Sequence, residues 1–297
     1  MKARSILVAL SLVCATVSCK SQFEMMLQSS DVDAKYAAAF QMFEAGKYNK
    51  AAQLFESLSV QTNGTEKDDT VLYYWGLSNY KFKDFYTAET NFEKFVTNYP
   101  RSPFASDARY LRIDCLYKQT LRYELDQSPT NRALSEIGLY LREYPETPHL
   151  EDCEAMIKDL HWRLDTKAFE GAKLYYRMED YLASRVALVN VLKDNAENIY
   201  REDILYYTAM SSYKYAKLSV PQKQKERYLV FSDDYLNFVG EMPESKYRKE
   251  LDVLYQRAQK ALGRYTGEVN DTREKSFAKE RKKLEKAGAS EKSKESE

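Results

Sequence analysis

The stretch of residues 76–103, GLSNYKFKDFYTAETNFEKFVTNYPRSP, constrains the fold most, because its spacing is that of two helices joined by a tight turn. Gly76 is a small residue where two helices can cross. Ala88 and Phe92 form a small and large pair at helical spacing that can face back at it. Pro100 then stops the second helix. The stretch therefore predicts one helical hairpin that needs further hairpins to cover its apolar face.

The spacing of the second helix recurs along the chain, with five copies in all. Each copy has four side chains at intervals of three, four and three residues, namely Tyr48/Ala51/Phe55/Leu58, Phe85/Ala88/Phe92/Phe95, Thr130/Ala133/Ile137/Tyr140, Tyr181/Ser184/Leu188/Val191 and Tyr228/Phe231/Tyr235/Phe238. The unit resembles the tetratricopeptide repeat, a helix pair of roughly 34 residues. Such units bury their apolar faces only by stacking on one another.

We therefore expect an all-α fold, a right-handed α-solenoid of about five tetratricopeptide-like helix pairs, over residues 31–262. The N-terminal repeats would occupy residues 31–145 and the C-terminal repeats residues 146–262. The sparse turn-forming residues, Gly 9 and Pro 7, argue against an all-β sandwich.

Later repeats are longer than the ideal unit, and we expect the extra length in long first helices at about 103–124 and 148–178. A helix over about 244–262 would cap the last repeat, because the end of a solenoid needs a cover. Residues 263–297 are almost entirely charged or small, so we expect a charged, disordered tail.

The first eighteen residues are typical of an export signal. Lys2 and Arg4 precede an apolar run that is too short to span a bilayer. Residues 1–18 are therefore left out of the fold prediction.

The segment Val17-Ser18-Cys19-Lys20 resembles the lipobox of bacterial lipoproteins. The resemblance implies that Cys19 is acylated and becomes the mature N-terminus, with residues 19–30 as a lipidated tether. Lys20 after the cysteine suggests sorting to the outer membrane. The alternative is an ordinary secreted protein that is cleaved nearby.

Two other cysteines, Cys115 and Cys153, fall on apolar helix faces of neighbouring repeats. Counted from the preceding prolines they are about two helical turns out of step, or roughly 10 Å, which is beyond disulfide reach. We expect two buried free thiols with a structural role.

No catalytic or metal-binding pattern stands out. Acidic and basic residues balance at 45 each, so nothing favours nucleic acid as a partner. His149 and His161 have no metal ligand at suitable spacing, and no phosphate loop or nucleophile elbow occurs. We expect no enzyme activity, no cofactor and no metal.

A binding surface is then the candidate functional feature. In tetratricopeptide repeats the first helix of each pair lines the inner face, so the candidate groove residues are Tyr36, Phe40, Phe43, Tyr73, Leu77, Tyr80, Arg109 and Arg112. An aromatic groove ending in two guanidinium groups would suit an extended peptide with an apolar end and a carboxylate. The alternative is that several of these aromatics are inter-helix core.

Residues 31–262 as a whole resemble the BamD family, lipoprotein subunits of the machinery that assembles outer-membrane β-barrels. The segments that carry the resemblance are residues 74–79, residues 99–102, the link from Ala133 to Thr147, and Tyr175-Tyr176. The resemblance implies a non-enzymatic scaffold on the periplasmic face of the outer membrane.

The same resemblance implies two partners. The C-terminal repeats would dock on a BamA-type barrel protein with periplasmic repeats, and the N-terminal repeats would receive unfolded β-barrel substrates. Arg185 is nearest to the basic docking residue of that family.

Two other functions fit the same repeats. One is a different periplasmic lipoprotein scaffold, serving secretion, pilus assembly or envelope constriction. The other is a glycan-binding surface lipoprotein, although the chain has only Trp75 and Trp162 to stack on sugars.

Overall fold

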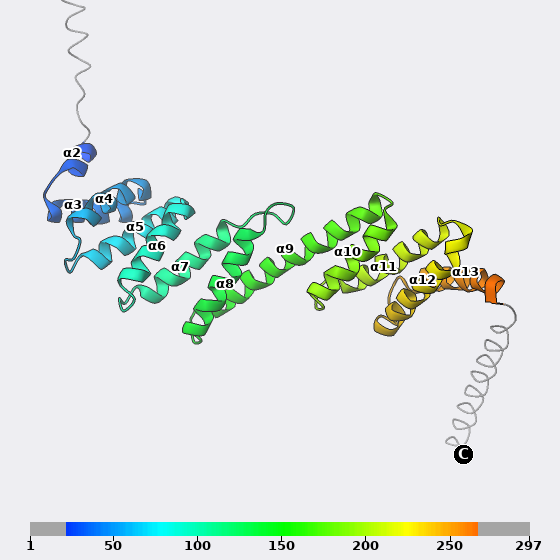
Figure 1. Cartoon of the computed structure of the whole chain (residues 1–297). Helices are drawn as coiled ribbons and strands as arrows, with labels where there is room; N and C mark the ends of the chain where they lie inside the picture. Colours follow the sequence, from blue (N-terminus) through cyan, green and yellow to red (C-terminus); the bar gives the residue numbers. More distant parts are fainter. Residues whose placement is uncertain (1–21, 267–297) are drawn as a thin grey trace, which may run out of the picture. The chain divides into compact units, whose positions relative to one another are not determined.

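The computed structural model describes residues 22–266, and every regular element in that range is a helix (Figure 1). The chain forms two compact units, one that ends at His161 and one that begins at Trp162. The predicted all-α class of stacked helix pairs is confirmed for this range. Cys19, the residue expected to carry the lipid, precedes it.

The first unit contains three helix pairs, preceded by a short helix. Its helices are α2 (Gln22–Gln28), α3 (Val32–Glu44), α4 (Tyr48–Gln61), α5 (Asp68–Phe82), α6 (Phe85–Asn98), α7 (Ala105–Lys118) and α8 (Ser128–Glu143). From α3 onwards each helix packs on the next. Helix α2 lies within the expected tether and packs on both α3 and α4, because Phe23, Met26 and Leu27 join the first apolar cluster.

The second unit is built in the same way. The boundary between the units falls within α9 (Leu150–Arg177), and the helices that follow are α10 (Tyr181–Asp194), α11 (Arg201–Lys217), α12 (Pro221–Glu241) and α13 (Arg248–Thr266). Helices α11 and α12 share the largest apolar cluster, and α13 covers it with Leu251, Ala258 and Leu262.

The repeat positions deduced from the spacing are the core of each pair. On α8 all four positions are buried, and on α12 likewise. On α4 and α6 the last three positions are buried and the leading aromatic is half-buried. The three-four-three spacing places these side chains on one helical face, which is why a single stripe of sequence defines each core.

Gly76 lies where α5 packs tightly against α6. A Cβ atom at this position would lie 2.8 and 2.9 Å from two ring carbons of Phe92. The small residue and the large ring thus form the crossing point that the sequence indicates.

Three of the turns inside helix pairs share one backbone feature. Gly46, Lys83 and Glu179, each two residues before the second helix, have φ values of 70°, 69° and 62°. The following residue caps the second helix in two of these turns, where Asp84 accepts a hydrogen bond from the Thr87 amide and Asp180 from the Ala183 amide.

Two predicted helix bounds were wrong. The first helix of the third repeat ends at Lys118 instead of continuing to about residue 124. The residues that follow form a connecting loop. The Gln127 side-chain amide donates to the Arg122 and Leu125 carbonyls of this loop and so gives these backbone groups hydrogen-bond partners. The last helix begins at Arg248 and runs to Thr266, four residues past its expected end.

Cys115 and Cys153 are both buried free thiols, as predicted. Burial raises the pKa of the Cys115 thiol to about 12 and that of Cys153 to about 11. Both are therefore protonated at neutral pH and serve as apolar packing groups. Between residues 22 and 266 no helix combines the length and the apolar character that crossing a bilayer requires.

Candidate functional site

Two candidate groove residues, Tyr73 and Tyr80, lie on one face of α5 and bond to the next repeat. The Tyr73 hydroxyl donates to Asp107 on α7, and the Tyr80 hydroxyl donates to Asp114 over 2.6 Å. Burial and these carboxylates raise the pKa of both phenols well above the usual value. Both hydroxyls therefore stay protonated and donate hydrogen bonds to carboxylates of the next repeat.

The same arrangement repeats between α7 and α9. Tyr110 donates to Asp152 over 3.1 Å, and Tyr117 donates to Asp159 over 3.0 Å. In each helix the partners are seven residues apart, so they stand two turns apart on one face. We call these four bonds the tyrosine–aspartate ladder, and sequence reasoning missed it.

The ladder decides the role of Tyr73. Its side chain is 6% exposed and its ring stacks on Phe104, with centroids 4.5 Å apart. Leu77 is half-buried and packs against the same apolar cluster. Tyr73 therefore belongs to the core between helices and does not line a groove.

The first-repeat candidates, Tyr36, Phe40 and Phe43, are half-buried on α3. The Phe40 and Phe43 rings meet Tyr74 edge-on at centroid distances of 4.7 and 5.2 Å. The Lys67 ammonium lies 5.0 Å from the centre of the Tyr36 ring. The structure brings these three side chains together, and each keeps part of its surface in solvent.

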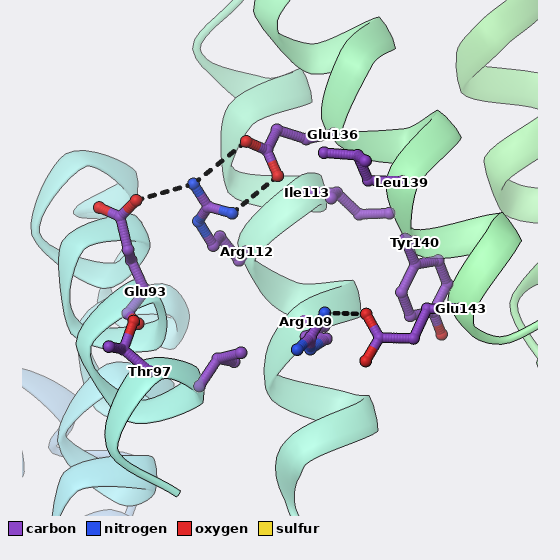
Figure 2. Close-up of a pocket in the computed structure, with 10 residues that line it drawn as sticks. Glu93, Thr97, Arg109, Arg112, Ile113, Glu136, Leu139, Tyr140 and Glu143 are labelled. Atoms are coloured by element: carbon purple, nitrogen blue, oxygen red, sulfur yellow. Dashed lines mark hydrogen bonds and ion pairs between the residues drawn. The ribbon is translucent and has the colours of Figure 1, made fainter. Parts of the chain in front are cut away.

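Arg112 is held by carboxylates of two neighbouring helices. Its guanidinium contacts Glu89 and Glu93 of α6 at 3.1 and 3.0 Å, and Glu136 of α8 at 2.8 Å. Figure 2 shows the group between Glu93 and Glu136. With three acidic partners and only 16% of its side chain exposed, Arg112 joins α6, α7 and α8.

Arg109 is held less firmly. It pairs with Glu143 on α8, and both partners are partly exposed, with 30% and 46% of their side chains in solvent. Its Nε atom is buried, and no residue in the described range accepts a bond from it. A ligand can therefore reach the partly exposed guanidinium end that pairs with Glu143, while the Nε donor stays buried without a partner.

The arginines and the tyrosines do not form one groove, which corrects the expected arrangement. Asp107 and Asp114 face α5, whereas Arg109 and Arg112 face α6 and α8. At 3.6 residues per turn the two pairs are about half a turn apart around α7. The aromatic positions and the guanidinium groups therefore occupy opposite faces.

A groove does occur on the arginine side. It lies between α6 and α8 with α7 below, encloses about 280 Å³, and includes Val96, Ile113 and Leu139 among its lining residues. Figure 2 shows Arg109 and Arg112 within it, with Glu136 and Glu143 alongside. Apolar side chains beside fixed charges suit an extended polypeptide more than a compact cofactor.

In the second unit Arg185 is also engaged. Its guanidinium forms two bonds to Asp234 on α12, of 2.7 and 2.8 Å, and one of 3.1 Å to Ser212 on α11. The bond to Asp234 raises the pKa of Arg185. The side chain lines a pocket of about 290 Å³ together with Leu182 and Val230, both partly exposed.

Between residues 22 and 266 no group of three histidine, cysteine or acidic side chains is placed to hold a metal ion. The side chains show packed helix pairs with surface hollows, among them those lined by Arg109 and Arg185.

Comparison with known proteins identifies a family and a relative of this chain. A family model described as "Outer membrane lipoprotein", YfiO, matches residues 28–229. A relative from Caulobacter vibrioides, "Outer membrane protein assembly factor BamD", is 23% identical over 160 residues. That match covers 54% of this chain and 52% of the relative, so the chain spans about half the length of the relative it matches.

Among solved structures, the TPR2AB-domain:pHSP90 complex of yeast Sti1 is similar at 14% identity with a TM-score of 0.37. The match covers 77% of this chain and 99% of that one.

Proposed function

The chain belongs to the YfiO family of outer membrane lipoproteins, and on this premise we propose that it is a lipid-anchored, non-enzymatic scaffold for β-barrel assembly at the periplasmic face of the outer membrane. Cys19 would carry the lipid. The name of the Caulobacter relative, an assembly factor, supports this role. The stacked helix pairs support it too, because such repeats display long surfaces for other chains.

We propose two contacts for the scaffold. The second unit would dock on a BamA-type barrel protein with periplasmic repeats, through the pocket beside Arg185. Because Asp234 holds two of its donors, Arg185 would offer a partner its remaining Nη1 group, while Leu182 and Val230 would supply apolar contact. The first unit would receive unfolded outer-membrane substrates.

The observation that carries the substrate role is the partly exposed Arg109–Glu143 ion pair in the groove between α6 and α8. An exposed ion pair such as Arg109–Glu143 contributes about 0–1 kcal/mol, so a substrate carboxylate can replace Glu143 at little cost. Arg112, with three carboxylates, would stay in place. Tyr36, Phe40 and Phe43 remain candidates for a separate aromatic contact.

The test uses a synthetic peptide of the last strand of an outer-membrane barrel, with a free C-terminal carboxylate and, separately, a C-terminal amide. Arg109→Gln should weaken binding of the free acid by about tenfold or more, because a bond to a charged group contributes about 1.5–3 kcal/mol. Its effect on the amide should be much smaller. Fluorescence anisotropy measures both.

Arg142→Gln is the matched control, since Arg142 is exposed, lies on α8 and does not line the groove. Equal affinities of the two variants for the free acid would place the substrate elsewhere on the first unit.

A further inference from the structure

The edge of the first unit where two turns adjoin carries a cluster of lysines. The α3–α4 and α5–α6 turns line one hollow of about 380 Å³. Its charged side chains are all basic: Lys47, Lys50, Lys81 and Lys83. All four are exposed. We call this surface the lysine edge.

The fold does not neutralise this charge. None of the four lysines forms an ion pair with a residue between 22 and 266. The acidic residues near them in sequence, Glu44 and Asp84, do not line the hollow and number two against four lysines. The lysine edge therefore keeps a net positive charge.

Helix dipoles account for only half of the cluster. Lys81 in the last turn of α5 and Lys83 at its C-cap sit where a helix favours cations. Lys47 and Lys50 occupy the N-cap and first turn of α4, where a helix disfavours cations. The stability of α4 therefore does not explain why Lys47 and Lys50 lie at its N-terminus.

Aromatic side chains accompany the lysines. Phe82 is 51% exposed although it is large and apolar, and Tyr48 is half-buried beside it in the hollow. Basic residues that flank an exposed aromatic ring are the composition that binds at the headgroup level of a membrane.

Helix α2 connects this edge to the N-terminus. The Lys50 ammonium lies 5.1 Å from the centre of the Phe23 ring, near the start of α2. At the other end of α4, Gln61 donates to the Ser29 carbonyl over 3.5 Å. Helix α2 therefore runs alongside α4 in the same direction, and its first residue lies at the end that carries the lysine edge.

The link between Cys19 and α2 is short. Two residues, Lys20 and Ser21, lie between Cys19 and Gln22, the first residue of α2, so three residue steps join them, and an extended chain covers at most about 3.6 Å per step. The start of α2 is thus within about 11 Å of a lipid attached at Cys19, which is close to one Debye length at physiological salt. Lys20 adds another positive charge to this segment.

We propose that the lysine edge binds the anionic phosphate headgroups of the membrane leaflet that holds the lipid anchor. The contact would fix the first repeat against the membrane surface, where a lipid alone leaves the protein free to rotate. The orientation at the membrane depends on the lipid at Cys19 and so on the proposed function. The affinity for anionic lipid depends only on the lysine edge.

The test uses the mature chain without the export signal of residues 1–18 and with Cys19→Ala, so that neither the signal nor a lipid tail contributes, and co-sedimentation with vesicles. Vesicles of phosphatidylglycerol and phosphatidylethanolamine should bind the protein, and phosphatidylcholine vesicles should not. Raised salt should release it, because the interaction is screened. Lys47→Ala with Lys83→Ala should weaken the binding by about tenfold or more, since each lysine near an anionic surface contributes about a fivefold factor.

Lys94→Ala with Lys158→Ala is the matched control, because both lysines are exposed, lie outside the hollow and remove the same charge. Equal binding to the two vesicle types, or an equal loss in both double variants, would overturn the proposal. Circular dichroism checks that each variant is folded.

The outcome is separable from the proposed scaffold role. If the unsubstituted chain failed to fractionate with membranes, or failed to co-purify with a barrel protein, the scaffold role would be wrong while the vesicle result stood. If the vesicles failed to bind and co-purification succeeded, only the lysine edge would be wrong.

Discussion

At the scale of single residues, polar side chains in the first unit mainly join one repeat to the next. Tyr80 and Asp114 illustrate this, because the phenol and the nearly buried carboxylate come from first helices of successive repeats. Asp114 also pairs with Lys118, so the loss of the Tyr80 hydroxyl removes one of two partners of a buried carboxylate. The ladder is therefore a stability feature, and its residues are poor choices for testing a groove.

Tyr80→Phe should lower the free energy of unfolding by about 1–3 kcal/mol, because it removes a hydroxyl bonded to a charged group. Tyr86→Phe is the control, since Tyr86 is 71% exposed, and it should change stability by less than about 0.5 kcal/mol. Urea denaturation followed by circular dichroism measures both. A harmless Tyr80→Phe would mean that water replaces the bond without loss.

Gly76→Ala tests the crossing of α5 and α6. The added methyl would lie within 3 Å of the Phe92 ring, which is fully buried, so we expect a loss of about 1–3 kcal/mol. Gly138→Ala, where the methyl meets nothing within 4 Å, should instead be neutral or stabilising by up to about 1 kcal/mol. The same sign for both in thermal denaturation would contradict this packing.

At the scale of helices and turns, the sequence was informative where periodicity decides the structure. Positions such as Ala133 and Ile137 are buried because a three-four spacing always lies on one helical face. The ladder was missed because it depends on the register between helices. Tyr73 and its partner Asp107 are 34 residues apart, so position 107 of α7 is the equivalent of position 73 of α5. By the same offset Arg109 is the equivalent of Trp75, which lies on another face of α5 than Tyr73. The predicted groove therefore combined residues from two different faces.

The positive φ angles in three equivalent turns allow a reciprocal test of the turn geometry. Glu179→Gly should stabilise the protein by about 1 kcal/mol, because a side chain in the left-handed region is strained. Gly46→Ala should destabilise it by about the same amount through the positive φ angle alone, since a Cβ there meets no neighbouring atom within 4 Å. Opposite shifts of the urea midpoint are expected, and shifts of equal sign would refute the shared conformation.

At the scale of the whole molecule, the chain has the features of a scaffold. Two units of packed helix pairs carry surface hollows beside Arg109, Arg185 and the lysine edge, and each hollow has a different chemistry. Mixed charges beside apolar side chains suit polypeptide partners, whereas the all-basic edge suits a membrane surface. Membership of the outer membrane lipoprotein family agrees with a protein that works beside a membrane.

Co-purification from detergent-solubilised outer membranes, quantified by mass spectrometry, tests the scaffold role most directly. The tagged, lipidated chain should recover a barrel protein with periplasmic repeats in near-equal amount. Leu182→Glu, at the exposed rim of the Arg185 pocket, should reduce that recovery, and Leu174→Glu, exposed outside that pocket, should not. Recovery of the chain alone, or with components of a secretion, pilus or constriction system, would contradict a role in barrel assembly.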